Sequence, residues 1–246
     1  MTSKLTPMMI QYREVKEKYK DCILFFRLGD FYEMFFEDAL IASKELEITL
    51  TGRNCGLEER APMCGVPFHS AESYVVRLVE KGYKVAICEQ TEDPKDAVGI
   101  VKRDVTRIIT PGTIIEGVTS DDKRNRYIMS LYKEGACWGI CTADTGTGEI
   151  YCTQIIVGAT SDKVINETAK FKPAEIIINS EADNFLSERL KKVTDAFIYP
   201  VENELFDRKN ALDRVEKQFK KVTNEVKMFH IGINATGALL LYLDKL

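Results

Sequence analysis

The sequence predicts an α/β protein of two domains, and three observations support this prediction. The chain has 246 residues, of which 45% are hydrophobic and 29% charged, a balance typical of globular proteins with a buried core. Short apolar runs of strand length alternate with stretches in which apolar residues recur at helical spacing. Turn-forming and charged residues dominate the segment 113–126. We therefore expect domains at residues 1–112 and 127–246, joined by a linker at 113–126.

The first domain is expected to have a mixed α/β order. Thr6 followed by Pro7 is typical of a helix start, and Ser70 is placed to cap a later helix that ends near Gly82. Residues 52–67 contain several Gly and Pro residues, so a loop is expected there. The apolar runs predict strands at residues 22–28, 47–51 and 83–88, and a final strand that ends at Ile109.

The stretch 27–36 joins the first expected strand to a helix. From Tyr32 onward, apolar residues recur at helical spacing, and Asp30 is placed to cap the first turn. Phe31 would then lie at the mouth of this helix, where an aromatic side chain can act as a wedge between base pairs. The alternative is structural, with Glu33 as the partner of Asp30 in a capping box and Phe31 at the edge of the core.

The second domain is expected to begin with three antiparallel strands, the last two joined by a hairpin at residues 144–149. Helices and strands then alternate, and the end of the chain is mostly helical. This order is the ribonuclease-H-like arrangement. The expected strands are 127–131, 136–143, 150–157, 174–178 and 196–199, and the expected helices include 161–171 and 181–192.

The main alternative function is that of a metal-dependent nuclease. Ribonuclease-H-like sheets can hold metal ions between carboxylates, and Asp144 and Glu149 flank the hairpin. Such a site needs further acidic partners from other strands, so a turn role for Asp144 is favoured. Cys55, Cys64 and His69 match no compact zinc spacing, and the sequence has no phosphate-binding G-x-x-x-x-G-K-[ST] loop. We expect no metal, no cofactor and no catalysis in this chain.

Neither half of the sequence has the basic balance of a stand-alone DNA-binding protein. The chain has 34 Lys and Arg against 38 Asp and Glu, a net charge of −4, and each half is slightly acidic. We expect weak binding to duplex DNA unless other segments of a larger clamp contact the phosphates. No apolar run reaches the ~20 residues of a membrane span, so we expect a cytoplasmic protein.

Four separated motifs resemble, in sequence and order, the N-terminal part of the MutS family of bacterial mismatch-repair proteins. The motifs are Gly29-Asp30-Phe31-Tyr32-Glu33, Ala61-Pro62-Met63-Cys64-Gly65-Val66-Pro67-Phe68-His69, Ala86-Ile87-Cys88-Glu89-Gln90 and Arg107-Ile108-Ile109-Thr110-Pro111-Gly112-Thr113. The resemblance implies a mixed-sheet mismatch-recognition domain at 1–112 and a ribonuclease-H-like connector domain at 127–246. It also implies binding to duplex DNA that carries a mismatch or a small insertion/deletion loop.

The resemblance favours the wedge over the capping box and implies roles for individual residues. Phe31 would stack on a mispaired or unpaired base from the minor groove, and Glu33 would hydrogen-bond that base. Arg53 matches a basic position beside the DNA backbone, and His69 and Arg107 lie in matching motifs as further candidate contacts. The family's ATPase, with ATP and Mg, its lever and its clamp would lie beyond these 246 residues. A homodimer of the full-length protein and a MutL-like partner are implied in the same way.

Overall fold

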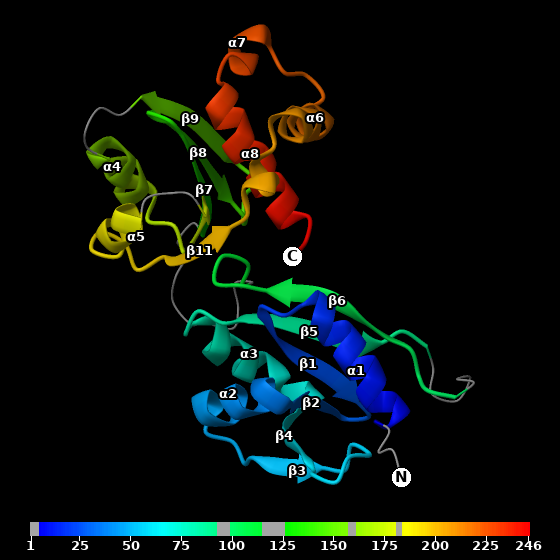
Figure 1. The fold of residues 1–246 in the computed structure, drawn as a ribbon. Helices are drawn as coiled ribbons and strands as arrows, with labels where there is room; N and C mark the ends of the chain where they lie inside the picture. Colours follow the sequence, from blue (N-terminus) through cyan, green and yellow to red (C-terminus); the bar gives the residue numbers. More distant parts are fainter. Residues whose placement is uncertain (1–4, 93–98, 115–125, 157–160, 181–183) are drawn as a thin grey trace. The chain divides into compact units, whose positions relative to one another are not determined.

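The computed structural model describes residues 5–92, 99–114, 126–156, 161–180 and 184–246 (Figure 1). The chain forms two compact units, Met1–Asp121 and Asp122–Leu246, which we call the first and second unit. Residues 115–125 of the expected linker lie outside the described part, so the bounds 113–126 stay a prediction.

The first unit is built on a six-stranded mixed sheet in the order β3-β4-β2-β1-β5-β6. β1 and β5 are parallel, and every other neighbouring pair is antiparallel. The strands are β1 (Cys22–Leu28), β2 (Phe31–Phe35), β3 (Thr51–Arg53), β4 (Ala61–Pro67), β5 (Lys84–Gln90) and β6 (Arg103–Ile109). The helices are α1 (Pro7–Lys18), α2 (Phe36–Leu46), the short 3-10 helix η1 (Phe68–Ser70) and α3 (Ala71–Val79).

Helices cover both faces of this sheet, because side chains alternate between the two faces along each strand. In β1, Ile23 and Phe25 belong to the core shared with α2 and α3. Leu24 and Phe26 belong to the core shared with α1. The result is a three-layer α/β unit, in which Figure 1 shows α2 and α3 next to each other and α1 apart from them.

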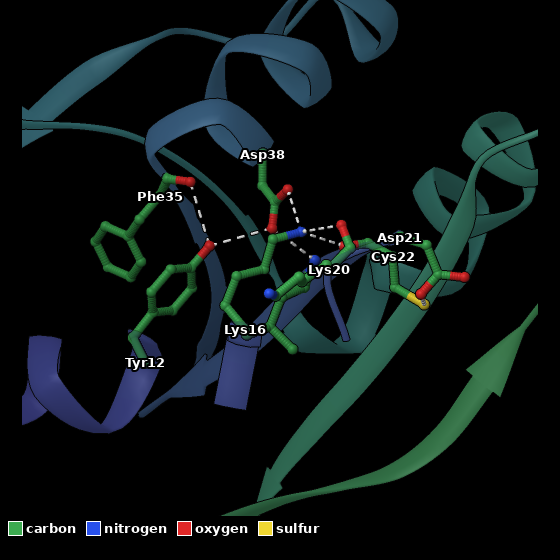
Figure 2. Close-up of polar contacts among 8 residues, drawn as sticks. Tyr12, Lys16, Lys20, Asp21, Cys22, Phe35 and Asp38 are labelled. Carbon is green, nitrogen blue, oxygen red and sulfur yellow. Dashed lines mark hydrogen bonds and ion pairs between the residues drawn. The ribbon is translucent and has the colours of Figure 1, made fainter. Parts of the chain in front are cut away.

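A buried carboxylate, Asp38, ties α1, β1 and α2 together (Figure 2). Only 4% of this residue is exposed. Its Oδ1 accepts from the Lys16 ammonium at 2.9 Å, and its Oδ2 accepts from the Leu24 amide at 3.0 Å and the Tyr12 hydroxyl at 3.2 Å. Burial, followed by the nearby charge of Asp38, raises the pKa of Tyr12 well above its usual value, so its hydroxyl stays a donor.

The stretch that was expected to start a helix at Tyr32 forms strand β2 instead. Gly29 adopts a left-handed φ of +59°, and the chain reverses so that Leu28 pairs with Phe31 in an antiparallel hairpin. Helix α2 begins only at Phe36. The predictions of Asp30 as a helix cap and of Glu33 as its capping-box partner are therefore wrong.

Two further expectations for the first unit are corrected. The Gly- and Pro-containing segment 52–67 contains part of β3 and all of β4, because β4 is held between β2 and β3. The strand expected at 47–51 is absent: Glu47 ends α2 in a left-handed conformation, and β3 starts at Thr51. The helix start at Pro7 and the strand at 22–28 are confirmed.

The second unit has a five-stranded sheet in the order β11-β10-β7-β8-β9. β7, β8 and β9 form an antiparallel meander. β10 pairs in parallel with β7, and β11 pairs in parallel with β10, which is the ribonuclease-H-like order that was predicted. The strands are β7 (Tyr127–Glu134), β8 (Cys137–Asp144), β9 (Ile150–Ile156), β10 (Glu175–Asn179) and β11 (Phe197–Val201). The helices are α4 (Asp162–Phe171), α5 (Asn184–Leu190), the 3-10 helix η2 (Asn203–Phe206), α6 (Arg208–Phe219), α7 (Asn224–Lys227) and α8 (His230–Leu243).

Helix α8 packs unusually close both to the sheet of the second unit and to α6. A Cβ added at Gly139 of β8 would lie 1.9 Å from the carbonyl oxygen of Ile231, and one at Gly237 would lie 2.4 Å from the Cα of Ala211 in α6. Glycine is needed at both positions because the backbones themselves are in contact. The opposite face of the sheet packs on α4 and α5 around the buried ring of Trp138.

Candidate nucleic-acid interface

Phe31 and Glu33 lie on the same face of β2, because residues two apart in a strand point the same way. Phe31 is an aromatic residue, yet it is 46% exposed at the start of the strand. The Glu33 side chain is 16% exposed. Tyr32, between them, points to the other face and is buried in the core. The strand therefore places an aromatic ring and a carboxylate on one face, while the residue between them packs in the core on the other face.

Gly65 of β4 forms the floor beneath these two side chains. It pairs with Glu33 in the sheet, and a Cβ at this position would lie 3.4 Å from Glu33 Cγ and 3.8 Å from Phe31 Cδ1. The same Cβ would lie 3.2 Å from the carbonyl oxygen of Tyr32, which is tighter than ordinary contact. The missing side chain lets both Phe31 and Glu33 lie across β4.

Arg53 reaches Glu33 from the far side of this floor. Arg53 is the last residue of β3 and pairs with Ala61 of β4, a register that puts it on the same face as Gly65 and Glu33. Its Nη1 donates to Glu33 Oε2, and the two form an ion pair. The structure thus brings together three of the sequence-predicted residues, with Arg53 bound to Glu33.

A second cluster, on the other face of the sheet, supports the turn that carries Phe31. The guanidinium of Arg27 lies 3.8 Å from the ring centroid of Phe68 and 5.4 Å from that of Tyr32. Tyr32 donates its hydroxyl to Glu89, and burial together with this bond raises the pKa of Tyr32 to about 12. The Phe68 amide also donates to the carbonyl of Asp30 at 2.9 Å. Three of the four sequence motifs therefore meet at this turn.

Of the two remaining candidate contacts, His69 lies close to the Phe31 turn, two residues after Pro67, which pairs with Phe31, whereas Arg107 lies on a distant strand. His69 is exposed in η1, with its ring edge-on to Phe68 at 5.9 Å. Arg107 is exposed on β6, paired with Ile87, and lies on the face that α2 and α3 cover. β1 and β5 separate β6 from β2. Arg107 therefore does not join the Phe31 face of the sheet.

The carboxylates of the alternative nuclease interpretation serve local structure. Asp144 is buried at the end of β8, and its Oδ1 accepts from the amides of Gly146 at 2.9 Å and Thr147 at 3.4 Å. Glu149 accepts from the hydroxyl of Tyr151 at 2.9 Å. Across the ranges that the structure describes, no group of three or more His, Cys, Asp or Glu residues is placed to hold a metal ion. The nuclease interpretation is not supported.

Cys55 and Cys64 lie in the two different cores, on opposite faces of the sheet. They therefore do not converge with His69 on a zinc site. Among the described helices, none is both long and apolar enough to cross a membrane.

Sequence reasoning missed several residues that the structure makes important. Arg53 was placed beside DNA without its partner Glu33, and the supporting contacts of Arg27 and the floor at Gly65 were not anticipated. In the second unit, Glu175 is buried and accepts from the hydroxyl of Tyr242. A carboxylate inside an apolar strand run is a signal for such a buried partner.

Comparisons with known proteins match both units to one family. A family model described as MutS domain I matches residues 6–118, and one described as MutS domain II matches residues 126–246. The DNA mismatch repair protein MutS of Acetivibrio thermocellus is 56% identical over 243 residues, and that of Ruminiclostridium cellulolyticum is 54% identical over 242 residues. Each alignment covers 98% of this chain and 28% of the relative.

The DNA mismatch repair protein MutS of Clostridioides difficile is 65% identical over 177 residues, which cover 72% of this chain and 18% of that protein. The chain thus spans little more than a quarter of the length of the relatives that match it along its whole length. The two matched domain models follow each other in the same order as the two units. This chain belongs to the MutS family and comprises its domains I and II.

Proposed function

We propose that the first unit recognises mispaired or unpaired bases in duplex DNA, with Phe31 as the wedge and Glu33 as the group that hydrogen-bonds the base. The observation that carries this proposal is the 46% exposure of Phe31 on a well-supported hairpin, next to a carboxylate. Its ring belongs to neither core cluster of the first unit. The fold therefore does not require an aromatic residue at this position, whereas a wedge does.

Physical chemistry favours a mismatch as the target of this pair. Stacking of a base on an aromatic ring contributes about 1–3 kcal/mol, and a mispaired step unstacks at lower cost than a sound one. An unpaired thymine exposes a ring N–H from which an ionised Glu33 can accept a hydrogen bond, whereas in a sound pair this donor is engaged. A carboxylate without such a partner is repelled by the phosphates. Glu33 therefore penalises matched DNA to the extent that Arg53 does not neutralise it, and it holds the mismatch.

The chain is proposed to act within a longer, cytoplasmic protein. Its net charge of −4 leaves little counterion release to drive binding by itself, so other segments of the same protein would supply most phosphate contacts. Arg53, His69 and Arg107 are proposed as further contacts to the DNA backbone. ATP and Mg, homodimer formation and a MutL-like partner belong to the longer protein in this proposal, and these residues themselves perform no catalysis.

The test is a pair of titrations of the full-length protein with matched and mismatched duplexes, before and after Phe31→Ala. The affinity for the mismatched duplex should fall to that for the matched one, because the stacking partner is lost. Phe219→Ala is the matched control, since Phe219 of α6 is similarly exposed at 44% but lies in the second unit. A mismatch preference that survives Phe31→Ala would overturn the proposal. Metal-dependent cleavage of DNA by this chain would favour the nuclease alternative.

A further inference from the structure

The ion pair between Arg53 and Glu33 occupies the carboxylate that base recognition would use. Glu33 lies across Gly65 towards β3, and Arg53 takes one of its two oxygens. Among the described residues, Glu33 has no other ion-pair partner, and neither has Arg53. A base stacked on Phe31 would therefore have to compete with Arg53 for Glu33.

The exposure of the two side chains shows which partner is free to move. Arg53 is 39% exposed, whereas Glu33 is 16% exposed. A guanidinium has five N–H donors, and an exposed one exchanges a carboxylate for water or phosphate at little cost. A mostly buried carboxylate that loses its only cation, in contrast, needs a new hydrogen-bond donor. Glu33 is therefore released only when something else donates to it.

We propose that Arg53 is a specificity-determining residue that acts through Glu33, by holding this carboxylate until an unpaired base supplies a competing donor. This inference rests on the proposed roles of Phe31 and Glu33. On matched DNA no base donor is available, so the ion pair persists and Glu33 makes no base contact. On mismatched DNA the base N–H replaces Arg53, and the released guanidinium faces the phosphates. Arg53 thus sets how strong a base donor must be before Glu33 leaves the ion pair and accepts from the base.

This role differs measurably from a simple contact with the backbone. A residue that only binds phosphate contributes equally to matched and mismatched duplexes and changes the salt dependence of both. A residue that competes for Glu33 changes the ratio of the affinities for mismatched and matched duplexes. It does so only while position 33 carries a carboxylate. The two roles are separable by a double-mutant cycle.

The experiment measures the dissociation constants of the full-length protein for matched and mismatched duplexes in four forms: unaltered, Arg53→Met, Glu33→Gln, and both changes together. Methionine keeps much of the length of the side chain but removes the donors. Arg53→Met should weaken binding to matched DNA and raise the preference for the mismatch by about fivefold, which corresponds to an ion pair at the upper end of the exposed range. In the Glu33→Gln background, Arg53→Met should leave the preference unchanged.

Arg60→Met is the control for the loss of a positive charge in the same hairpin. Arg60 is exposed just before β4 and makes no ion pair with the described residues. Arg60→Met should weaken binding to both duplexes equally or to neither. The inference is overturned if Arg53→Met weakens both duplexes by the same factor, or if its effect on the preference is the same with and without the Glu33 carboxylate. Failure of the proposed function has a separate signature, a mismatch preference that does not depend on Phe31.

Discussion

Replacing Asp38 with alanine is expected to destabilise the first unit and leave the second unchanged. Asp38 is 4% exposed and accepts from three donors. The Lys16 ammonium is 25% exposed and also donates to the Cys22 carbonyl at 2.6 Å, so it loses little. Tyr12 keeps the carbonyl of Phe35 at 3.2 Å as an acceptor. The Leu24 amide, in the centre of β1, loses its acceptor completely.

The size of the effect follows from these contacts. A buried donor left without an acceptor costs about 1–3 kcal/mol, and the lost bonds of Tyr12 and Lys16 together add about 1 kcal/mol. We expect the free energy of unfolding of the first unit to fall by about 2–4 kcal/mol. For a unit of this size, the thermal midpoint should fall by roughly 8–16 °C.

The single tryptophan of the chain allows the two units to be followed separately. Trp138 is fully buried in the second unit, so its fluorescence reports the unfolding of that unit, whereas far-UV circular dichroism reports both. In Asp38→Ala, part of the dichroism should be lost at lower temperature while the Trp138 transition stays in place. Glu17→Ala is the control, because its ion pair with Lys20 is exposed at the surface. The reasoning is refuted if Asp38→Ala leaves both transitions unchanged or shifts the Trp138 transition equally.

Three further predictions concern packing, thiols and the linker. Gly139→Ala should lower the free energy of unfolding of the second unit, followed by Trp138 fluorescence, by about 3 kcal/mol or more. The added Cβ would meet the backbone of α8 at 1.9 Å, and an unchanged Trp138 transition would contradict this packing. Thiol titration of the native chain with an aromatic disulfide should count at most two cysteines, Cys137 first and then Cys152, which is slower because burial of its thiol raises its pKa, and seven after unfolding. Burial holds back the other five and raises the pKa of Cys22, Cys64 and Cys88 to about 12, so more than two fast thiols would show that these cores are open. Limited proteolysis should cut first within residues 113–126, and a first cut within α3 or β5 would mean that the division into two domains is wrong.

The sequence predicted strands best where the apolar run was continuous. β1 and β5 have buried residues on both faces, so each contains a continuous apolar run, residues 22–26 in β1 and 85–88 in β5, and these runs lie within the expected strands. β2 was mistaken for a helix because Tyr32, Phe35 and Phe36 also fit a helical period. The signal against a helix was Gly29-Asp30 between two apolar runs, which is typical of a two-residue hairpin turn. β4 was missed because its Pro and Gly residues are usually turn formers.

The candidate site was predictable only in part, for a physical reason. Phe31 and Glu33 are two residues apart, so local sequence can relate them once the strand is known. Arg53 is twenty residues from Glu33 along the chain, and the two meet only through the registers of β3 with β4 and of β4 with β2. A shift of one residue in either register would move Arg53 to the opposite face. Such pairings depend on the whole sheet and cannot be read from a local pattern.

At the proposed recognition site, the strand conformation lets binding and folding depend on different residues. In a helix, Phe31, Tyr32 and Glu33 would point in three directions about 100° apart, and an exposed wedge would not lie beside its carboxylate. In β2, alternate residues face opposite sides, so Phe31 and Glu33 lie on one face while Tyr32 packs in the core on the other. The free energy of folding therefore depends on Tyr32 and on its contacts with Arg27 and Glu89. Phe31 is consequently free to be specialised for a partner, since little stability is lost when its side chain changes.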